Sequence, residues 1–252
     1  MSIYNIISED IKENNYGNIA TITVGVVTDI NDPDKLGRIK VKLLNRTTSE
    51  CETDFIRVMT PMSGTEWGMF FLPEVGDEVL VAFCDGDICR PYVIGSLWNN
   101  NRKQPAKIAD DGKNNIREIK TRSGHSIIFD DTENAEKIDV ITSKELKLSF
   151  DDKDEFITVK DKDGNNEIKI DSKNGAISIK AKQKIELAAG NSKITLDGQG
   201  NSVSIESNGE LKISGNQVKI DGQSTTELKS SGQVTVQASG ITNVKGSMVK
   251  LN

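Results

Sequence analysis

The residues able to do chemistry are few in this chain, and they stand in turn-like contexts. His125 is the only histidine, and imidazole is the commonest side-chain ligand of transition metals. Three copies of His125 around a symmetry axis could hold a metal ion, whereas the run RSGH at 122–125 equally suits a structural turn. We favour the turn, because no Cys/His set with metal-ligand spacing accompanies this histidine.

Two acidic pairs, at 130–131 and 151–152, are candidates for acid/base partners or calcium ligands. Neighbouring side chains on a strand point to opposite faces, so the two carboxylates of a pair do not converge, and we interpret both pairs as solvated bends. The run DKDG at 161–164 hints at a calcium loop, but the downstream ligands and flanking helices are missing. With no Ser/His/Asp set and no phosphate-binding glycine loop, we expect no enzyme, no metal and no cofactor.

The three cysteines are an odd number, which predicts free thiols in a reducing compartment. They are Cys51, Cys84 and Cys89. Cys84 and Cys89 flank the turn DGD at 85–87 and could face each other across a hairpin, although a disulfide there would need oxidising conditions.

The elements that position these residues differ between the two halves of the chain. Every Trp, Tyr and Phe lies at or before Phe156, and all five prolines lie between Pro33 and Pro105. The overall aromatic content of 5% is low for a globular enzyme. The first half therefore has ordinary globular chemistry, and the second half buries only Ile, Leu, Val, Met and Ala.

Charge and hydropathy exclude several partners and locations. A formal charge of -6 and an isoelectric point near 5.1 argue against steering toward nucleic acid phosphates. The chain begins with no charged segment followed by an apolar run, so we expect no signal peptide of the usual kind. No apolar run approaches the length of a membrane span. We therefore expect the protein to assemble in the cytoplasm.

Residues 19–98 predict an all-β barrel. Five or six short strand-like runs occur in about 80 residues, with turn formers between them and no helical periodicity. A small closed barrel of the OB type fits this pattern best. A short arm, 1–18, precedes it and carries an apolar cluster, Ile3, Tyr4, Ile6 and Ile7, that is frayed or docks on a partner. A polar linker, 99–115, follows it.

Residues 116–252 predict a β-helical rod. Apolar pairs at i and i+2 return every seven to nine residues, with Gly, Asn, Ser, Asp or Gln between them. Two buried side chains per strand are too few for a free-standing sheet, so the strands must wrap round an axis and be covered by copies of themselves, within the chain or between chains. The pairs are Ile168 and Ile170, Ile177 and Ile179, Ile185 and Leu187, Ile194 and Leu196, Val203 and Ile205, Leu211 and Ile213, Val218 and Ile220, and Val234 and Val236.

Several motifs, in order and with consistent spacing, resemble the barrel domain of VgrG and baseplate spike proteins. They are GRIKV at 37–41 after an Asp-Pro loop, WG at 67–68, LPEVGDEVLVAF at 72–83, and DGD with RPYVIGS at 85–96. The run TRSGHSIIFDD at 121–131 resembles the segment where such proteins leave the barrel and begin the needle. The likeness covers roughly residues 20–131.

The resemblance implies a parallel homotrimer in which three OB barrels form a collar and three chains wind into one intertwined triple-stranded β-helix. In such a rod each strand bonds to strands of other chains, and a narrow axis takes aliphatic side chains and excludes rings. The implied function is a structural, membrane-piercing spike, pushed through a target envelope when the sheath of a phage tail, bacteriocin or injection particle contracts. The particle would be extracellular after release.

The same resemblance implies two protein partners. The chain lacks the large hub domain and any lysozyme-like insert, so we expect a separate baseplate hub protein, contacted by the arm residues Ile3, Tyr4, Ile6 and Ile7 or by the collar. At the other end the strand pattern continues to the last residue, which predicts either a self-closed blunt end or a docking surface for a small PAAR-type tip protein. The tip contact would use Met248, Val249, Lys250, Leu251 and Asn252.

Three alternatives remain open from the residues alone. Periodicity is equally consistent with a single-chain solenoid. A nucleic-acid binder would need a basic stripe interleaved with aromatics, which is missing. A glycan-binding or depolymerase tail spike would need aromatics and paired carboxylates on the rod, and no aromatic follows Phe156.

Overall fold

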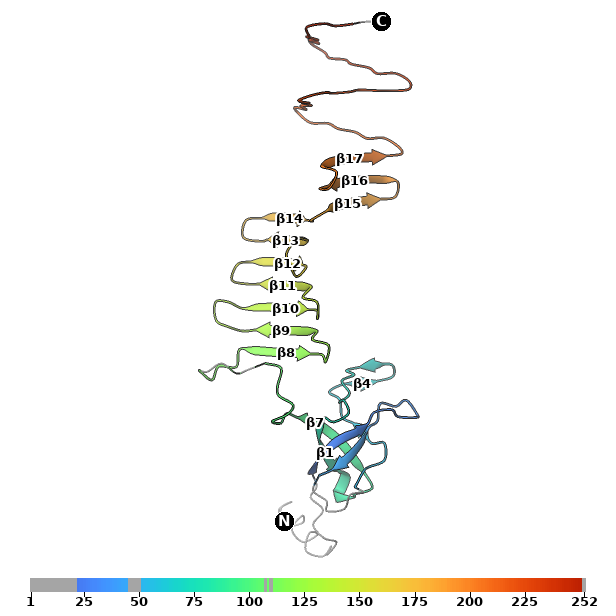
Figure 1. Cartoon of the computed structure of the whole chain (residues 1–252), viewed down its shortest axis with the longest axis vertical. Helices are drawn as coiled ribbons and strands as arrows, with labels where there is room; N and C mark the ends of the chain where they lie inside the picture. Colours follow the sequence, from blue (N-terminus) through green and yellow to red (C-terminus); the bar gives the residue numbers. More distant parts are fainter. Residues whose placement is uncertain (1–21, 45–50, 107, 109–110, 251–252) are drawn as a thin grey trace, which may run out of the picture. The chain divides into compact units, whose positions relative to one another are not determined.

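The computed structural model describes residues 22–44, 51–106, 108 and 111–250 of the chain. The chain divides into two compact units, Met1–Ile179 and Lys180–Asn252. Strands form nearly all regular structure of the described residues, and a single 3-10 turn, η1 (Cys84–Gly86), is the exception (Figure 1). The all-β prediction is therefore confirmed.

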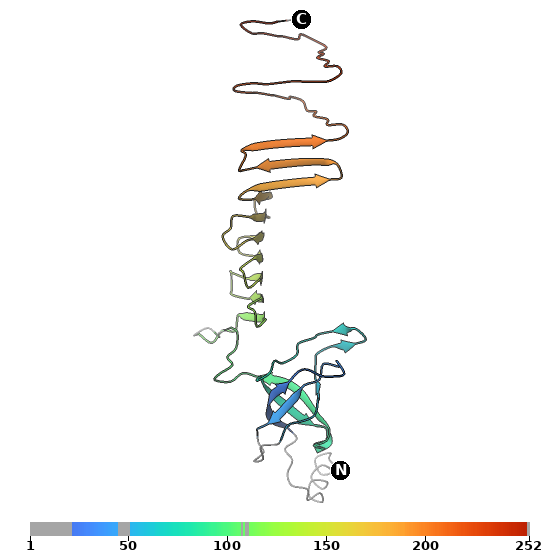
Figure 2. The ribbon, with the colours of Figure 1, turned by 45° about the vertical axis from the view of Figure 1, so that its right-hand side comes forward.

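The first unit contains a five-stranded sheet in the order β2-β1-β6-β7-β3. Figure 2 shows its strands as blue and green arrows. Its neighbours are antiparallel, except that β3 runs parallel to β7. A separate hairpin, β4-β5, extends from the loop after β3. The strand bounds are β1 (Ile22–Asp29), β2 (Lys40–Leu43), β3 (Arg57–Val58), β4 (Ser63–Gly64), β5 (Trp67–Gly68), β6 (Glu78–Phe83) and β7 (Pro91–Leu97).

Alternation along these strands builds the core of the barrel. Every second side chain of β6 is buried, which is the period expected when one face of a strand packs inward. Gly25 lets β1 approach β2 closely, because a Cβ there would lie 2.3 Å from Cγ1 of Val41. The buried apolar residues are Val27, Ile39, Val41, Leu43, Ile56, Val79, Val81, Phe83 and Val93.

A seven-stranded antiparallel meander follows in the same unit, in the order β8 to β14. Each strand pairs with the strand before it in the sequence, and tight turns join them. Gly124 and Gly164 take left-handed φ values of 91° and 63° in two of these turns. The bounds are β8 (Ile116–Lys120), β9 (Ser126–Asp130), β10 (Lys137–Ile141), β11 (Lys147–Asp151), β12 (Phe156–Lys160), β13 (Glu167–Asp171) and β14 (Ala176–Lys180).

The second unit holds a three-stranded meander and a long extended segment. The meander contains β15 (Lys184–Ala189), β16 (Ser192–Asp197) and β17 (Ser202–Ser207), paired antiparallel in register. Residues 208–250 continue in wide back-and-forth runs to which no strand is assigned (Figure 1).

The ladders of 116–207 join consecutive strands of one chain. This pairing of consecutive strands follows from the connections between them, which are only a few residues long. A tight connection returns the chain beside the strand it has just left, so an antiparallel hairpin forms.

Candidate functional site: open apolar faces of the C-terminal strands

The register of β8–β13 lines up apolar side chains in two rows on one face of the sheet. Because each strand pairs residue for residue with the next, the alternation of apolar and polar positions stays in phase over six strands. We call this surface the apolar face. One row is Ile119, Ile127, Val140, Leu148, Val159 and Ile168, and the other is Phe129, Ile138, Phe150, Ile157 and Ile170.

Within the described part of the chain, the apolar face stays largely open. Nine of its side chains are 37% to 49% exposed, with Ile170 the least and Val159 the most exposed of the nine. The other two, Leu148 and Ile157, are half-buried. On β14 the next pair of the pattern, Ile177 and Ile179, is 72% and 49% exposed. Row neighbours are paired across adjacent strands, and the side directed away from the sheet remains open. A long continuous apolar surface of this kind is a candidate interaction site.

The opposite face of the same sheet satisfies its own polar groups. The carboxylate of Asp139 accepts hydrogen bonds from Oγ of Ser149 at 2.5 Å and from Nζ of Lys147 at 2.8 Å. On β8 and β9, Oγ of Ser126 donates to Glu118 at 2.8 Å. A face with paired charges and hydroxyls is stable against water, so the two faces of the sheet are chemically distinct.

The three-stranded sheet of the second unit repeats this arrangement. Ile185, Leu196 and Val203 form one row, and Leu187, Ile194 and Ile205 form the other. Five of these six are 40% to 67% exposed, and Ile185 is half-buried. The predicted core positions on β13–β17 therefore lie together on open apolar faces.

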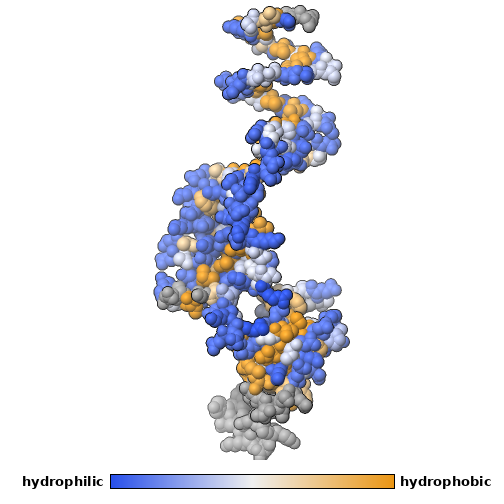
Figure 3. Space-filling view, in the orientation of Figure 1, coloured by the Kyte–Doolittle hydropathy of each residue, from blue (hydrophilic) through white to orange (hydrophobic). Residues whose placement is uncertain are grey.

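The remaining predicted core positions lie in the extended segment 208–250. All are exposed by 47% to 79%: Leu211, Ile213, Val218, Ile220, Val234 and Val236. Figure 3 shows apolar residues at the surface of this segment, between polar stretches. No strand pairing connects these residues to one another.

The predicted partner contacts are described only in part. Met248 and Val249 are 73% and 52% exposed, and Lys250 is exposed as well. Leu251 and Asn252, and the predicted hub contacts Ile3, Tyr4, Ile6 and Ile7, lie outside the described residues.

The polar candidates take structural roles in turns. The backbone amide of His125 donates to Oγ1 of Thr121 at 3.1 Å, and its Nδ1 accepts from the amide of Ser143 at 3.2 Å. Asp131 pairs with Arg117, and Asp151 accepts the amide of Asp154 at 3.0 Å. Over the described ranges, no group of three His, Cys, Asp or Glu residues could hold a metal ion. Hydrogen bonds chiefly from Thr132 lower the pKa of Asp130.

Cys51, Cys84 and Cys89 form no disulfide in the described part of the chain. Sγ of Cys84 lies 3.4 Å from a carboxylate oxygen of Asp85, within the turn that was a candidate for a disulfide-linked hairpin.

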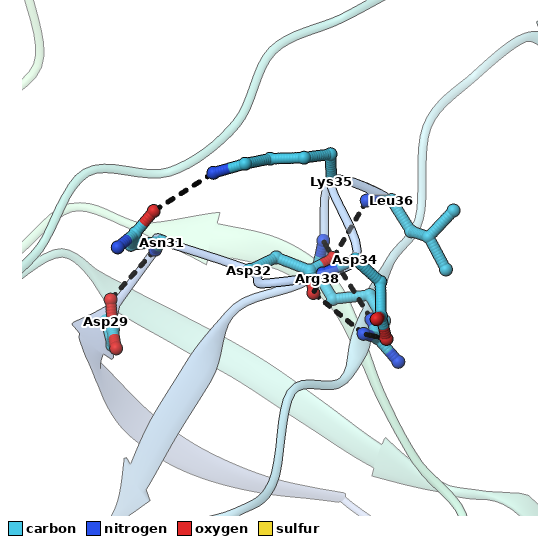
Figure 4. Close-up of polar contacts among 7 residues, drawn as sticks. All are labelled: Asp29, Asn31, Asp32, Asp34, Lys35, Leu36 and Arg38. Carbon is cyan, nitrogen blue, oxygen red and sulfur yellow. Dashed lines mark hydrogen bonds and ion pairs between the residues drawn. The ribbon is translucent and has the colours of Figure 1, made fainter.

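One structural site was missed by the sequence reasoning: the Asp32 carboxylate in the loop between β1 and β2 (Figure 4). Asp32 is 3% exposed and accepts the backbone amides of Asp34, Leu36 and Arg38. Nε and Nη2 of Arg38 donate to it at 3.1 and 2.7 Å. These bonds hold the pKa of Asp32 well below its ordinary value and raise that of Arg38. The available signal was an Asp-Pro loop followed closely by Gly-Arg.

The upstream part of the apolar face was also missed as a site. Its strand residues from Ile119 to Val159 were expected to continue the rod, but were not assigned to the core. Phe129 and Phe150 lie in its rows, so aromatic rings are accommodated in the first strands of the rod and are missing only after Phe156. The visible signal was the alternation within each five-residue run.

Two segments of the chain match known protein families. Residues 23–98 match the type VI secretion system/phage-baseplate injector OB domain. Residues 163–224 match a family of uncharacterised proteins conserved in bacteria, DUF2345. The second match spans β13 to β17 and continues into the extended segment.

Three curated relatives are each named a type VI secretion system spike protein. VgrG1b of Pseudomonas aeruginosa is 25% identical over 127 residues, covering 47% of this chain and 17% of that protein. VgrG2a of the same organism is 33% identical over 95 residues, covering 36% of this chain and 11% of that protein. VgrG3 of Vibrio cholerae is 26% identical over 111 residues, with coverage of 42% and 11%. The chain thus spans less than a fifth of the length of these relatives.

These similarities confirm the expected relationship to VgrG-type spikes and the OB assignment of the barrel. A relative at lower identity, 23% over 133 residues, is named actin cross-linking toxin VgrG1, and the match covers 12% of it. Across the described residues, no helix has the length and apolarity needed to cross a bilayer.

Proposed function

We propose that this chain, whose residues 23–98 belong to the family of type VI secretion and phage-baseplate injector OB domains, is the central spike of a contractile injection apparatus. Three copies would assemble in parallel, with the barrels forming a collar and residues 116–252 forming one needle. The observation that carries the proposal is the apolar face, a double row of aliphatic and phenyl side chains that is left open in a single chain.

The energetics favour cover by further copies. Fully burying one Val, Ile, Leu or Phe side chain contributes about 1.5–3 kcal/mol, so burying the exposed half of each contributes roughly 1 kcal/mol. Nine such side chains repeat along β8–β13 of every copy. A copy carries the same pattern at the same spacing, so it covers the face along its whole length. The opposite face needs no such cover, because its polar groups are already paired with one another. The number three is inferred from the relationship to VgrG-type spikes.

The contacts of the polar side chains in residues 116–207 support a structural role. Several charged and hydroxyl side chains of 116–207 pair with one another or stabilise turns, as Asp139 and His125 illustrate. We therefore infer that the chain serves as a stiff rod and is not itself an enzyme. Sheath contraction would drive this rod through a target envelope.

The two ends of the rod suit different partners. The exposed apolar side chains of Met248 and Val249 are consistent with a contact to a small PAAR-type tip protein, extended by Lys250, Leu251 and Asn252. At the opposite end we propose a separate hub protein, contacted through Ile3, Tyr4, Ile6 and Ile7 or through the barrels. Assembly would occur in the bacterial cytoplasm, and the finished particle would act outside the cell.

Deletion of the gene in the producing bacterium tests this proposal. We expect contractile particles that lack a central spike density by electron microscopy and no longer act on target cells, with both properties restored by the intact gene. Particles that keep their spike density and their activity without this chain would contradict the proposal.

A further inference from the structure

A cleft of about 810 Å³ lies at the end of the barrel where β1 begins. The buried side chains of Leu43 and Phe83 line it from the barrel core. Phe55 and Tyr92 are half-buried, Ile88 is 38% exposed, and all three add apolar surface to the lining. A cleft of this size with apolar walls and a few polar groups is typical of a binding site.

The cleft occupies the face by which OB folds commonly bind extended ligands. In such barrels the ligand lies against the second and third strands, between the loops that follow the first and fourth strands. Here those loops are 30–39 and 84–90, and they contribute Arg38 and Arg90 to the lining. Both arginines already have acidic neighbours, because Asp32 holds Arg38 (Figure 4) and Arg90 lies 3.4 Å from a carboxylate oxygen of Asp85.

A third arginine of the cleft, Arg57, has no acidic partner among the described residues. Its Nη2 donates to the phenol oxygen of Tyr92 at 2.7 Å, and its guanidinium carbon lies 4.8 Å from the centre of the Tyr92 ring. A planar guanidinium held in one orientation is suited to bind a carboxylate through two hydrogen bonds. One acidic residue, Asp54, also lines the cleft. The cleft therefore suits a ligand that combines an apolar stretch with a carboxylate.

The chain carries a segment of this kind before β1. The apolar cluster of Ile3, Tyr4, Ile6 and Ile7 is followed by an acidic pair at 9–10. Residues 1–18 contain three acidic side chains and one lysine, which gives a side-chain charge of -2. The charge of this arm is thus opposite to that of the arginine, and its apolar residues match the apolar lining.

The arm also enters the barrel beside the cleft. β1 begins at Ile22, which pairs with Ala82 on β6, and the next residue of β6, Phe83, lines the cleft. The 11 residues between position 10 and Ile22 can span up to about 40 Å when extended. The arm can therefore reach the cleft of its own barrel, where its effective concentration is high.

We propose that residues 3–10 bind in this cleft of their own barrel. The apolar cluster would lie against the rings of Phe55 and Tyr92, and the acidic pair would lie beside Arg57. The two alternatives for the hub contact, the arm and the barrel, would then form one surface. This last consequence rests on the proposed hub contact, whereas the binding of the arm does not.

Hydrogen–deuterium exchange on the purified full-length protein tests the proposal. We expect amides of residues 3–10 to exchange at least about tenfold more slowly than in an unstructured chain. Arg57→Glu should remove this protection. Lys42→Glu is the control, because Lys42 is an exposed cation of β2 that does not line the cleft, and it should leave the protection unchanged. Exchange at the unstructured rate in the wild type, or equal rates in the two variants, would overturn the proposal.

A charge reversal identifies the arm as the occupant. Glu9→Arg and Asp10→Arg, added to Arg57→Glu, should restore slow exchange of residues 3–10, and exchange that stays fast would overturn the proposal. In assemblies that mix isotope-labelled wild-type chains with an excess of Arg57→Glu chains, the wild-type arms should stay slow. Fast wild-type arms would place the arm on a neighbouring barrel and so contradict binding to its own.

The mass of the same sample separates this proposal from that of the spike. An assembly of three chains with unprotected arms would overturn the arm contact and leave the spike intact. A single chain with protected arms would support the arm contact and contradict the spike.

Discussion

Val159 and Lys160 allow the apolar face to be tested with two neighbouring substitutions. Both lie on β12, both are exposed in a single chain, and they point to opposite faces. Val159 stands between Leu148 and Ile168 in one row of the apolar face. If the chain acted alone, an aspartate at either position would be solvated and nearly harmless.

The proposed assembly predicts a large difference between the two variants. Val159 is 49% exposed, so cover by other copies removes about half of its surface from water. Losing that burial costs about 1 kcal/mol per copy and therefore roughly 3 kcal/mol per trimer, which is more than a hundredfold in the assembly constant. Three buried carboxylates at the same level add several kcal/mol more. We expect Val159→Asp to prevent assembly and Lys160→Asp to assemble normally.

Light scattering after size exclusion, together with thermal unfolding, measures the outcome. Val159→Ala serves as an intermediate control that should still assemble but melt at a lower temperature. If Val159→Asp gave the same mass and the same melting temperature as Lys160→Asp, the apolar face would not be an interface and the reasoning would be refuted.

Three further predictions concern other parts of the chain. Ile179→Asp and Leu196→Asp should each block assembly, and an SDS-resistant oligomer of either variant would show that these positions do not face inward. Asp32→Asn should lower the melting temperature of the barrel at neutral pH. Arg38 depresses the folded-state pKa of Asp32, so the stabilisation is present above the ordinary pKa of 3.8 and is lost as the pH falls further. The difference in melting temperature between wild type and variant should therefore shrink in acid. A difference that stays constant with pH would contradict this assignment. Deleting 248–252 should abolish binding of a tip protein in a pull-down, and unchanged binding would remove the predicted contact.

The sequence was sufficient to predict the all-β class, the OB barrel and the repeating strands, because each rests on local signals. Alternation in β6 places Val79, Val81 and Phe83 inward, and the return of apolar pairs at fixed intervals marks the successive strands of the rod. These patterns depend on the pleat of a single strand, and tertiary context does not override them here.

The partner of each strand could not be predicted from the same signals. An apolar pair such as Ile168 with Ile170 requires cover, but it does not determine whether the neighbouring strand belongs to its own chain. That choice depends on the geometry of the connecting turns, which makes β8–β14 a meander. The Asp32 site was missed for a similar reason, since its five donors converge only when the loop from Asp32 to Arg38 has folded.

The mass of the full-length protein in solution, determined by native mass spectrometry, tests the central claim most directly. The open apolar faces predict an assembly of three chains, about three times the 27.6 kDa of one chain, with no populated monomer. A stable, soluble monomer at micromolar concentration would contradict the proposed needle.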